Sequence, residues 1–199
     1  SLLQRSSTSR VRSSAASAVY KIQLQIQTLS IKATMIEEHL KNKLGEINKD
    51  LLENYSKVNN VGVLSGLSGI SLFFFYCSRF LKDDDLFDMG ITAIEDCVQM
   101  INEKSAPTTY FNGVVGFGWV LDHLEKEGFI EFDCDGFFYG IDDNLSTTMF
   151  GAMKSKNYDF INGAIGYALF FLCRYRNTKS SNLKEKYKGI LLRFIALLK

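Results

Sequence analysis

Three segments of the chain are apolar on nearly every face, and each begins with two glycines in a Gly-x-x-Gly step. The steps are Gly66–Gly69, Gly113–Gly116 and Gly163–Gly166, and their first glycines are separated by 47 and 50 residues. An interval near 50 residues is the length of a helical hairpin with its loops, so the pattern predicts an array of similar helical units. Glycine suits such a helix start because it tolerates positive φ in the loop and lets neighbouring backbones approach closely.

Amphipathic segments alternate with the apolar ones, as expected for outer helices that cover inner helices. The pattern predicts helices at about 35–55, 66–81, 83–102, 113–124, 135–154, 163–175 and 180–199. Within 135–154 the sequence GFFYGID is the least helix-like part of the chain. The predicted fold is therefore all-α, an incomplete α/α toroid with about three of seven hairpins and an exposed apolar edge. Because the last helix runs to Lys199 without a polar tail, the chain is expected to be cut there.

The first 34 residues differ from the rest in composition, and they predict a boundary between 1–34 and 35–199. They contain eight serines and five basic residues but no acidic residue, whereas the remainder has 18 basic and 22 acidic residues. Met35 is the first methionine, so 1–34 are interpreted as a disordered or non-native leader, with Met35 as the natural start. A transit peptide and a native disordered arm are the alternatives.

Composition excludes several classes of protein. The balance of charges offers no basic stripe for nucleic acid. No apolar run reaches the roughly 18 residues of a membrane span. The single proline against 15 glycines favours long helices. Four scattered cysteines favour free thiols over a disulfide framework and, with it, a cytoplasmic protein. They are Cys77, Cys97, Cys134 and Cys173.

Several motifs have both a chemical and a structural interpretation, and the structural one is favoured for each. Asp84-Asp85-Leu86-Phe87-Asp88 has the DDxxD spacing of a Mg²⁺ site, but 83–85 also suit a helix N-cap. Asp133-Cys134-Asp135-Gly136 resembles the start of a calcium loop but lacks its spacing and its closing Glu. His123 is expected in the core or at its rim, and His39 on an exposed helical face. The glycine steps lack the Lys-Ser/Thr of a phosphate loop.

Asp159 is the strongest candidate for a functional residue. It lies four residues before the third glycine step, in the sequence Tyr158-Asp159-Phe160-Ile161-Asn162-Gly163. In a toroid, the loops that precede inner helices surround one mouth of the central cavity. The carboxylate is therefore expected either to face a ligand there or to cap the helix.

Three stretches taken together resemble the lanthionine synthetase C-like family over about residues 60–175. They are LSGLSGISLFFFY (64–76), YFNGVVGFGWVLDHL (110–124) and YDFINGAIGYALFFL (158–172). The resemblance implies a seven-hairpin α/α barrel and a zinc-dependent cyclase. Such an enzyme adds peptide cysteine thiols to dehydrated Ser or Thr and closes thioether rings. It also implies a precursor peptide as substrate and a dehydratase as a further partner.

The resemblance carries one residue over to this chain. Tyr158, Asp159, Gly163 and Gly166 match the family's Tyr-Asp-x-x-x-Gly-x-x-Gly motif, so Asp159 is expected to act in acid–base catalysis. The family's zinc is held by a Cys and a later Cys-His pair, and no Cys-His dipeptide exists here. The expectation is therefore no cofactor or metal ligand in this chain, zinc in the full-length protein, and no activity of the chain alone. Two alternatives stay open, a toroidal carbohydrate-active enzyme with paired carboxylates and a non-catalytic peptide-binding relative.

Overall fold

The computed structural model describes residues 2–103 and 106–198, and all regular elements in these ranges are helices. Side chains are described from Lys21 onward, with the exception of Ile22. The chain divides into two compact units, 1–50 and 51–199. The helices are α1 (Leu2–Asn54), the short 3-10 helix η1 (Tyr55–Lys57), α2 (Leu67–Leu81), α3 (Asp84–Asn102), α4 (Val114–Lys126), α5 (Cys134–Phe138), α6 (Ile141–Lys154), α7 (Ala164–Asn177) and α8 (Ser181–Leu197).

The first unit is a single helical segment, the larger part of α1. The sequence predicted a helix from Met35, whereas α1 begins at Leu2 and includes the segment interpreted as a leader. Helix is allowed here because the first glycine of the chain is Gly45 and its one proline is Pro107. Large apolar side chains such as Leu29 and Ile31 are exposed along it. Whether 1–34 are native stays a prediction.

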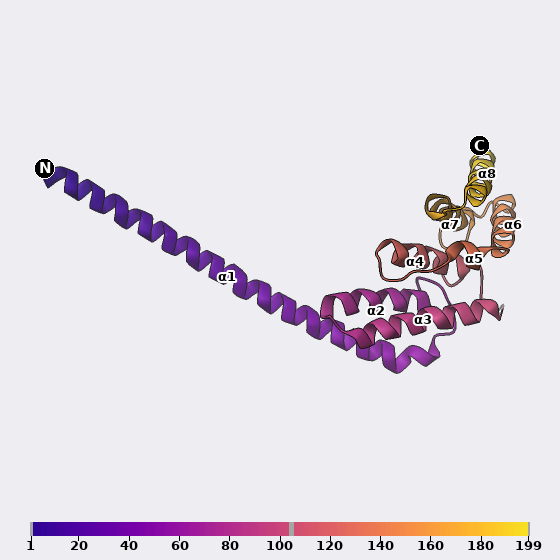
Figure 1. The fold of residues 1–199 in the computed structure, drawn as a ribbon, viewed down its shortest axis with the longest axis horizontal. Coiled ribbons are helices and arrows are strands. Elements are labelled where there is room, and N and C mark those ends of the chain that lie inside the picture. Colours follow the sequence, from indigo (N-terminus) through magenta and orange to yellow (C-terminus); the bar gives the residue numbers. More distant parts are fainter. Residues whose placement is uncertain (1, 104–105, 199) are drawn as a thin grey trace. The chain divides into compact units, whose positions relative to one another are not determined.

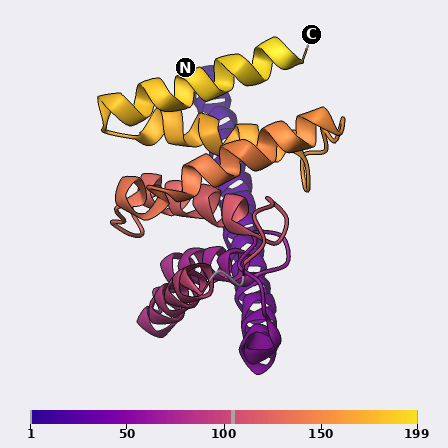
Figure 2. The ribbon, with the colours of Figure 1, turned by 90° about the vertical axis from the view of Figure 1, so that its right-hand side faces the viewer.

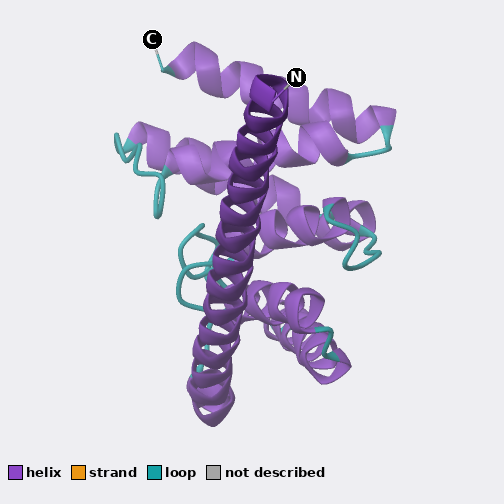
Figure 3. Ribbon diagram, turned by 90° about the vertical axis from the view of Figure 1, so that its left-hand side faces the viewer, coloured by secondary structure: helices purple, strands orange, loops and turns teal. Residues whose placement is uncertain are grey.

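In the described part of the second unit, three helical hairpins follow the end of α1 and η1, and α2, α4 and α7 are their inner helices. Among these, α2 packs on α4 and α4 packs on α7. Outer helices cover them, with α3 against α2, α6 against α7, and α8 against both α7 and α6. Figure 1 and Figure 2 show the hairpins following one another in chain order, and in Figure 3 the described residues are drawn as helices and loops. The all-α prediction is confirmed, and the alternation of inner and outer helices is consistent with a fragment of an α/α toroid.

The outer segment of the second hairpin is split, at the place that the sequence marked as least helix-like. Helix α5 ends at Phe138, and α6 begins at Ile141. Between them Gly140 has φ 87°, a left-handed conformation that side chains with a Cβ rarely adopt. The predicted helix at 135–154 is therefore two helices.

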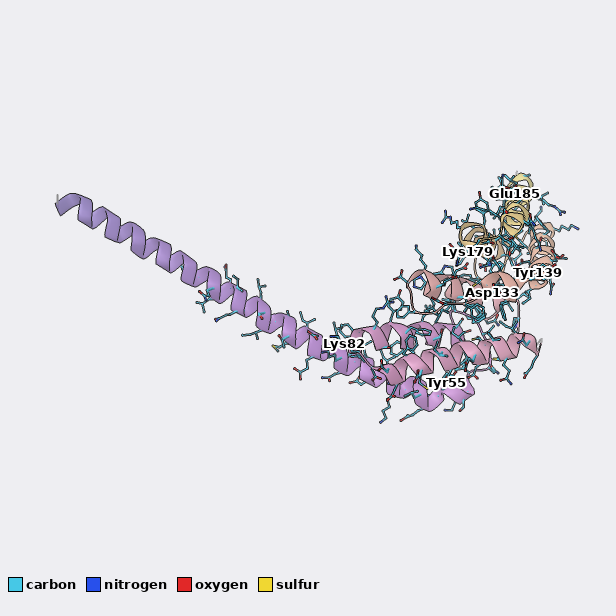
Figure 4. The ribbon with its side chains drawn as sticks, in the orientation of Figure 1. Tyr55, Lys82, Asp133, Tyr139, Lys179 and Glu185 are labelled. Carbon is cyan, nitrogen blue, oxygen red and sulfur yellow. The ribbon has the colours of Figure 1, made fainter. Side chains whose placement is uncertain are left out.

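The core of the second unit is built from aromatic and aliphatic side chains of the inner helices, the outer helices and the loops between them. Phe75, Phe117 and Phe170 are fully buried on α2, α4 and α7, one on each inner helix. The hydroxyl of Tyr55, labelled in Figure 4, donates a 2.7 Å hydrogen bond to the Asp96 carboxylate on α3. All four cysteines are unpaired, as predicted. Within the part of the chain that the structure describes, none of the helices combines the length and apolarity that crossing a bilayer requires.

Candidate functional site

Each inner helix is preceded by a loop of the same construction, here called a step loop (residues 60–66, 107–113 and 157–163). In each step loop, the backbone carbonyl six positions before the first glycine accepts a hydrogen bond. The donor is the backbone N–H of the residue directly after that glycine. These bonds join Leu67 to Asn60 at 2.9 Å, Val114 to Pro107 at 2.9 Å, and Ala164 to Asn157 at 3.0 Å. The three loops are thus closed by one repeated hydrogen bond.

The glycines of the steps are required by close backbone approach and not by positive φ. The first glycines, Gly66, Gly113 and Gly163, have φ of −127°, −138° and −129°, so the expectation of positive φ is wrong. A Cβ on the second glycine would lie 2.2 to 2.3 Å from the carbonyl oxygen six residues earlier, at Gly69, Gly116 and Gly166 alike. No side chain fits at that distance, so the second of the two predicted reasons for glycine is confirmed.

Successive step loops are joined by hydrogen bonds between equivalent positions. Leu64 N–H donates to Phe111 O at 3.2 Å, and Phe111 N–H donates to Ile161 O at 3.1 Å. Each of these residues is two positions before the first glycine of its step. The loops therefore stack in register at one end of the inner helices.

Asp159 lies in the third step loop with its side chain exposed. Its Oδ1 accepts a 2.6 Å hydrogen bond from Asn162 N–H, and its own N–H donates to the Asn157 side chain at 3.2 Å. The equivalent residue of the second loop is Thr109, whose hydroxyl accepts from Asn112 N–H at 3.4 Å. Asp159 thus closes a turn before the helix and has a counterpart that is not an acid.

The opposite end of the inner helices contains a buried ionic cluster, the Arg174 cluster (Asp122, Asp135, Arg174 and Thr178). Arg174 is 1% exposed, and its Nη1 donates to Asp122 Oδ1 at 3.0 Å. Its Nη2 contacts Asp135, whose other carboxylate oxygen accepts from the Thr178 hydroxyl at 2.8 Å. Because the cluster draws on α4, α5 and α7, it ties the ends of the second and third hairpins together.

Burial dominates the electrostatics of this end of the molecule. It raises the pKa of Asp122 against the opposing effects of Arg174 and Asn177. It also raises the pKa of the Cys134 thiol to about 12, with a further contribution from the Asp122 charge. A second buried carboxyl, Asp142, has its pKa raised by burial although Tyr187 donates a 2.6 Å hydrogen bond to it.

The other motifs take the structural roles that the sequence favoured. Asp83 caps α3 by accepting from Leu86 N–H at 3.2 Å, and Asp133 caps α5 by accepting from Gly136 N–H at 3.0 Å. His123 lies at the rim, stacked on Trp119 with ring centroids 5.3 Å apart. Its Nε2 is hydrogen-bonded to the Tyr76 hydroxyl at 2.8 Å. His39 is exposed on α1, as predicted.

Sequence reasoning missed the Arg174 cluster. A signal was present, because Asp122 in WVLDHL and Arg174 in YALFFLCRY are charged residues within apolar inner-helix runs. A buried charge needs a partner of opposite sign. The pairing itself depends on which inner helices are neighbours, and that is a property of the fold.

Comparison with known proteins gives one result. A family model described as lanthionine synthetase C-like protein matches residues 57–197, which is more than half of the chain. The searches of curated proteins and of solved structures found no significant match. The matched range begins at the last residue of η1 and extends through α8.

Proposed function

Because the chain belongs to the lanthionine synthetase C-like family, we propose that it is the N-terminal part of a peptide cyclase. The enzyme would join cysteine thiols of a precursor peptide to dehydrated Ser or Thr residues of the same peptide. We further propose that it acts in the cytoplasm and works with a dehydratase that prepares the substrate. The observation that supports this function is the family match over 57–197, combined with the three stacked step loops within that range.

The reaction is an addition that consumes nothing else. A bond forms between the thiol sulfur and Cβ of the dehydrated residue, and the thiol proton is lost while a proton is gained at Cα. An acid–base group beside the alkene can carry both proton transfers. We propose that Asp159 is this group, because it is an exposed carboxylate on a loop at the end of the inner helices.

Comparison with the second step loop shows that the turn at Asp159 does not need a carboxylate. Thr109 occupies the position equivalent to Asp159 and makes the same hydrogen bond to the N–H three residues later. A hydroxyl therefore suffices for the turn, and so does an amide oxygen. An acid is not needed at Asp159 for folding, which supports a chemical role for it.

The zinc ion of the family is not assigned to residues of this chain. The expected ligands include a Cys-His pair, and no such dipeptide occurs in the 199 residues. We propose that the full-length protein binds the ion through residues outside this sequence.

Two substitutions of Asp159 in the full-length protein test the proposal. Both Asp159→Asn and Asp159→Thr keep an oxygen that can accept from Asn162 N–H, and both remove the acid. We expect each variant to lose most cyclisation of a dehydrated precursor peptide while its unfolding temperature and zinc content stay unchanged. Cyclisation is measured as the loss of peptide thiols that react with an alkylating reagent, since ring closure does not change the peptide mass.

Thr109→Val is the matched control, because it alters the equivalent turn without removing an acid. It should lower stability slightly and leave the rate of cyclisation per folded molecule intact. Cyclisation that is unchanged in both Asp159 variants would assign Asp159 to the turn alone. A full-length protein that shows no cyclisation of any dehydrated peptide, yet binds such peptides, would favour the non-catalytic alternative.

A further inference from the structure

The structure brings together three potential metal ligands that are distant from Asp159, at the opposite end of the inner helices. They are Asp122 and Glu125 in the last turns of α4 and Cys134 at the start of α5. One donor atom from each lies within 4.8 Å of the other two. Ligands bound to one Zn²⁺ at about 2.0–2.3 Å lie about 3–4 Å from one another, so small side-chain adjustments would bring these atoms around one ion.

Asp122 has a buried oxygen that the fold leaves without a partner. The residue is 5% exposed, and Arg174 holds its Oδ1. The other oxygen, Oδ2, is buried and accepts no hydrogen bond of good geometry from the described residues, although Asn177 is near enough to lower the pKa of the carboxyl. A buried acceptor without a partner costs free energy, and a cation would satisfy it.

The charges around this point also favour a cation. Asp122, Glu125 and Asp135 carry three negative charges, whereas Arg174 is the one cation with ion pairs to this group among the described residues. The C-terminal end of α4 adds the partial negative charge of the helix dipole. Arg174 therefore leaves the group with a net negative charge, and its bond to Asp122 Oδ1 fixes the carboxylate as partners of metal ligands commonly do.

An ion could reach two of the three donors, Glu125 and Cys134, through a cavity. Its volume is about 230 Å³, and its lining also includes Asp133, Asp135, Arg174 and Lys179. Figure 4 labels Asp133 and Lys179. The volume accommodates several water molecules, which would complete the coordination of an ion held by three protein ligands.

We propose that Asp122, Glu125 and Cys134 form a binding site for a divalent transition-metal ion, with Zn²⁺ as the best fit to one thiolate and two carboxylates. On binding, the Cys134 thiol loses its proton to solvent and the sulfur bonds to the metal. The site is separate from the zinc expected in the family, because it contains no Cys-His pair. It does not depend on the proposed cyclase activity.

Cadmium is the direct probe, since a Cd²⁺–thiolate bond gives a charge-transfer absorption in the ultraviolet. The 199-residue chain, freed of metal with a chelator, is titrated with Cd²⁺ and then with Zn²⁺ in competition. We expect one ion to bind per chain, and we expect the absorption band to have the intensity of a single cadmium–sulfur bond. Cys134→Ser should abolish the band, whereas Cys77→Ser, which removes another buried thiol on α2, should leave it unchanged.

Glu125→Gln is the second variant, because this half-buried residue can be changed without exposing the Arg174 cluster. It should weaken Zn²⁺ binding by at least about tenfold, with an unchanged far-ultraviolet circular dichroism spectrum. Three results would overturn the proposal: no cadmium–sulfur band, a band that survives Cys134→Ser, or Zn²⁺ affinity that is unaffected by Glu125→Gln. Each of them leaves the proposed role of Asp159 untouched.

Discussion

Replacing Gly116 by alanine should destabilise the second unit, although alanine is the better helix former. The added Cβ would lie 2.2 Å from Tyr110 O and 3.0 Å from Val63 N, where ordinary contacts begin at about 3.4 Å. Both neighbours are backbone atoms and cannot rotate away. Moving Tyr110 would also strain the bonds from Val114 to Pro107 and from Val115 to Thr108, which close the step loop.

The expected loss of stability follows from how far the loop at Tyr110 must shift. Relief of the Tyr110 contact needs a shift of about 1 Å in a closed loop, and overpacking of this kind costs about 1–3 kcal/mol. For a protein of this length, a loss of about 2 kcal/mol lowers the unfolding temperature by about 4–8 °C. Gly151→Ala is the matched control, because Gly151 lies within α6 and a Cβ there meets nothing within 4 Å. It should raise the free energy of unfolding by about 0.5–1 kcal/mol.

Tryptophan fluorescence during urea unfolding is the suitable assay. Trp119 is the only tryptophan of the chain, and it lies on α4 one turn after Gly116, so its signal reports the second unit and not α1. A lower free energy of unfolding for Gly116→Ala and a higher one for Gly151→Ala would confirm the argument. A Gly116→Ala protein as stable as the parent, beside a stabilised Gly151→Ala protein, would refute the close approach of helix and loop.

Three further predictions concern the buried polar groups. Arg174→Met should cost about 3–5 kcal/mol in urea unfolding, because it leaves Asp122 buried without a cation; adding Asp122→Asn should recover part of that loss, and a strictly additive double variant would contradict the pairing. Tyr187→Phe should cost about 1–3 kcal/mol by the same assay, since it removes the hydrogen bond to buried Asp142. Burial raises the pKa of Asp142 above its unfolded value, so this carboxyl makes the protein less stable as pH rises from about 4 through its folded pKa. The stability of Asp142→Asn relative to the parent should therefore increase over that window in unfolding curves measured at several pH values, and a constant difference would show that the carboxyl is not perturbed.

The helices of the second unit could be predicted from the sequence because their signals are local. The apolar runs after Gly66, Gly113 and Gly163 set the inner helices, and the family resemblance drawn from them is confirmed by the match over 57–197. The start of α1 at Leu2 could not be predicted, because the serine-rich, acid-free composition of 1–34 favoured a disordered or non-native leader.

The contacts between hairpins were beyond the reach of the sequence. Asp122, Cys134 and Arg174 are separated by up to 52 residues, and only the packing of α4 against α7 and α5 brings them together. The bonds that join Leu64, Phe111 and Ile161 likewise depend on how the loops stack. The side-chain grouping and the bonds between loops both depend on which helices pack side by side, and a local sequence pattern does not contain that information.

The step loops have a consequence for how the length of this chain can vary. From the accepting carbonyl to the first glycine, each loop spans the same six positions, although the intervals between steps differ by three residues. The variation therefore lies outside the step loops: α2 has 15 residues and α4 has 13, and the outer segment of the second hairpin carries the break at Gly140. One residue inserted within a step loop would displace the Gly-x-x-Gly step from its carbonyl oxygens and move the inner helix out of register with its neighbour. The same insertion beside Gly140 would only lengthen an existing break, so relatives of different length are expected to differ there.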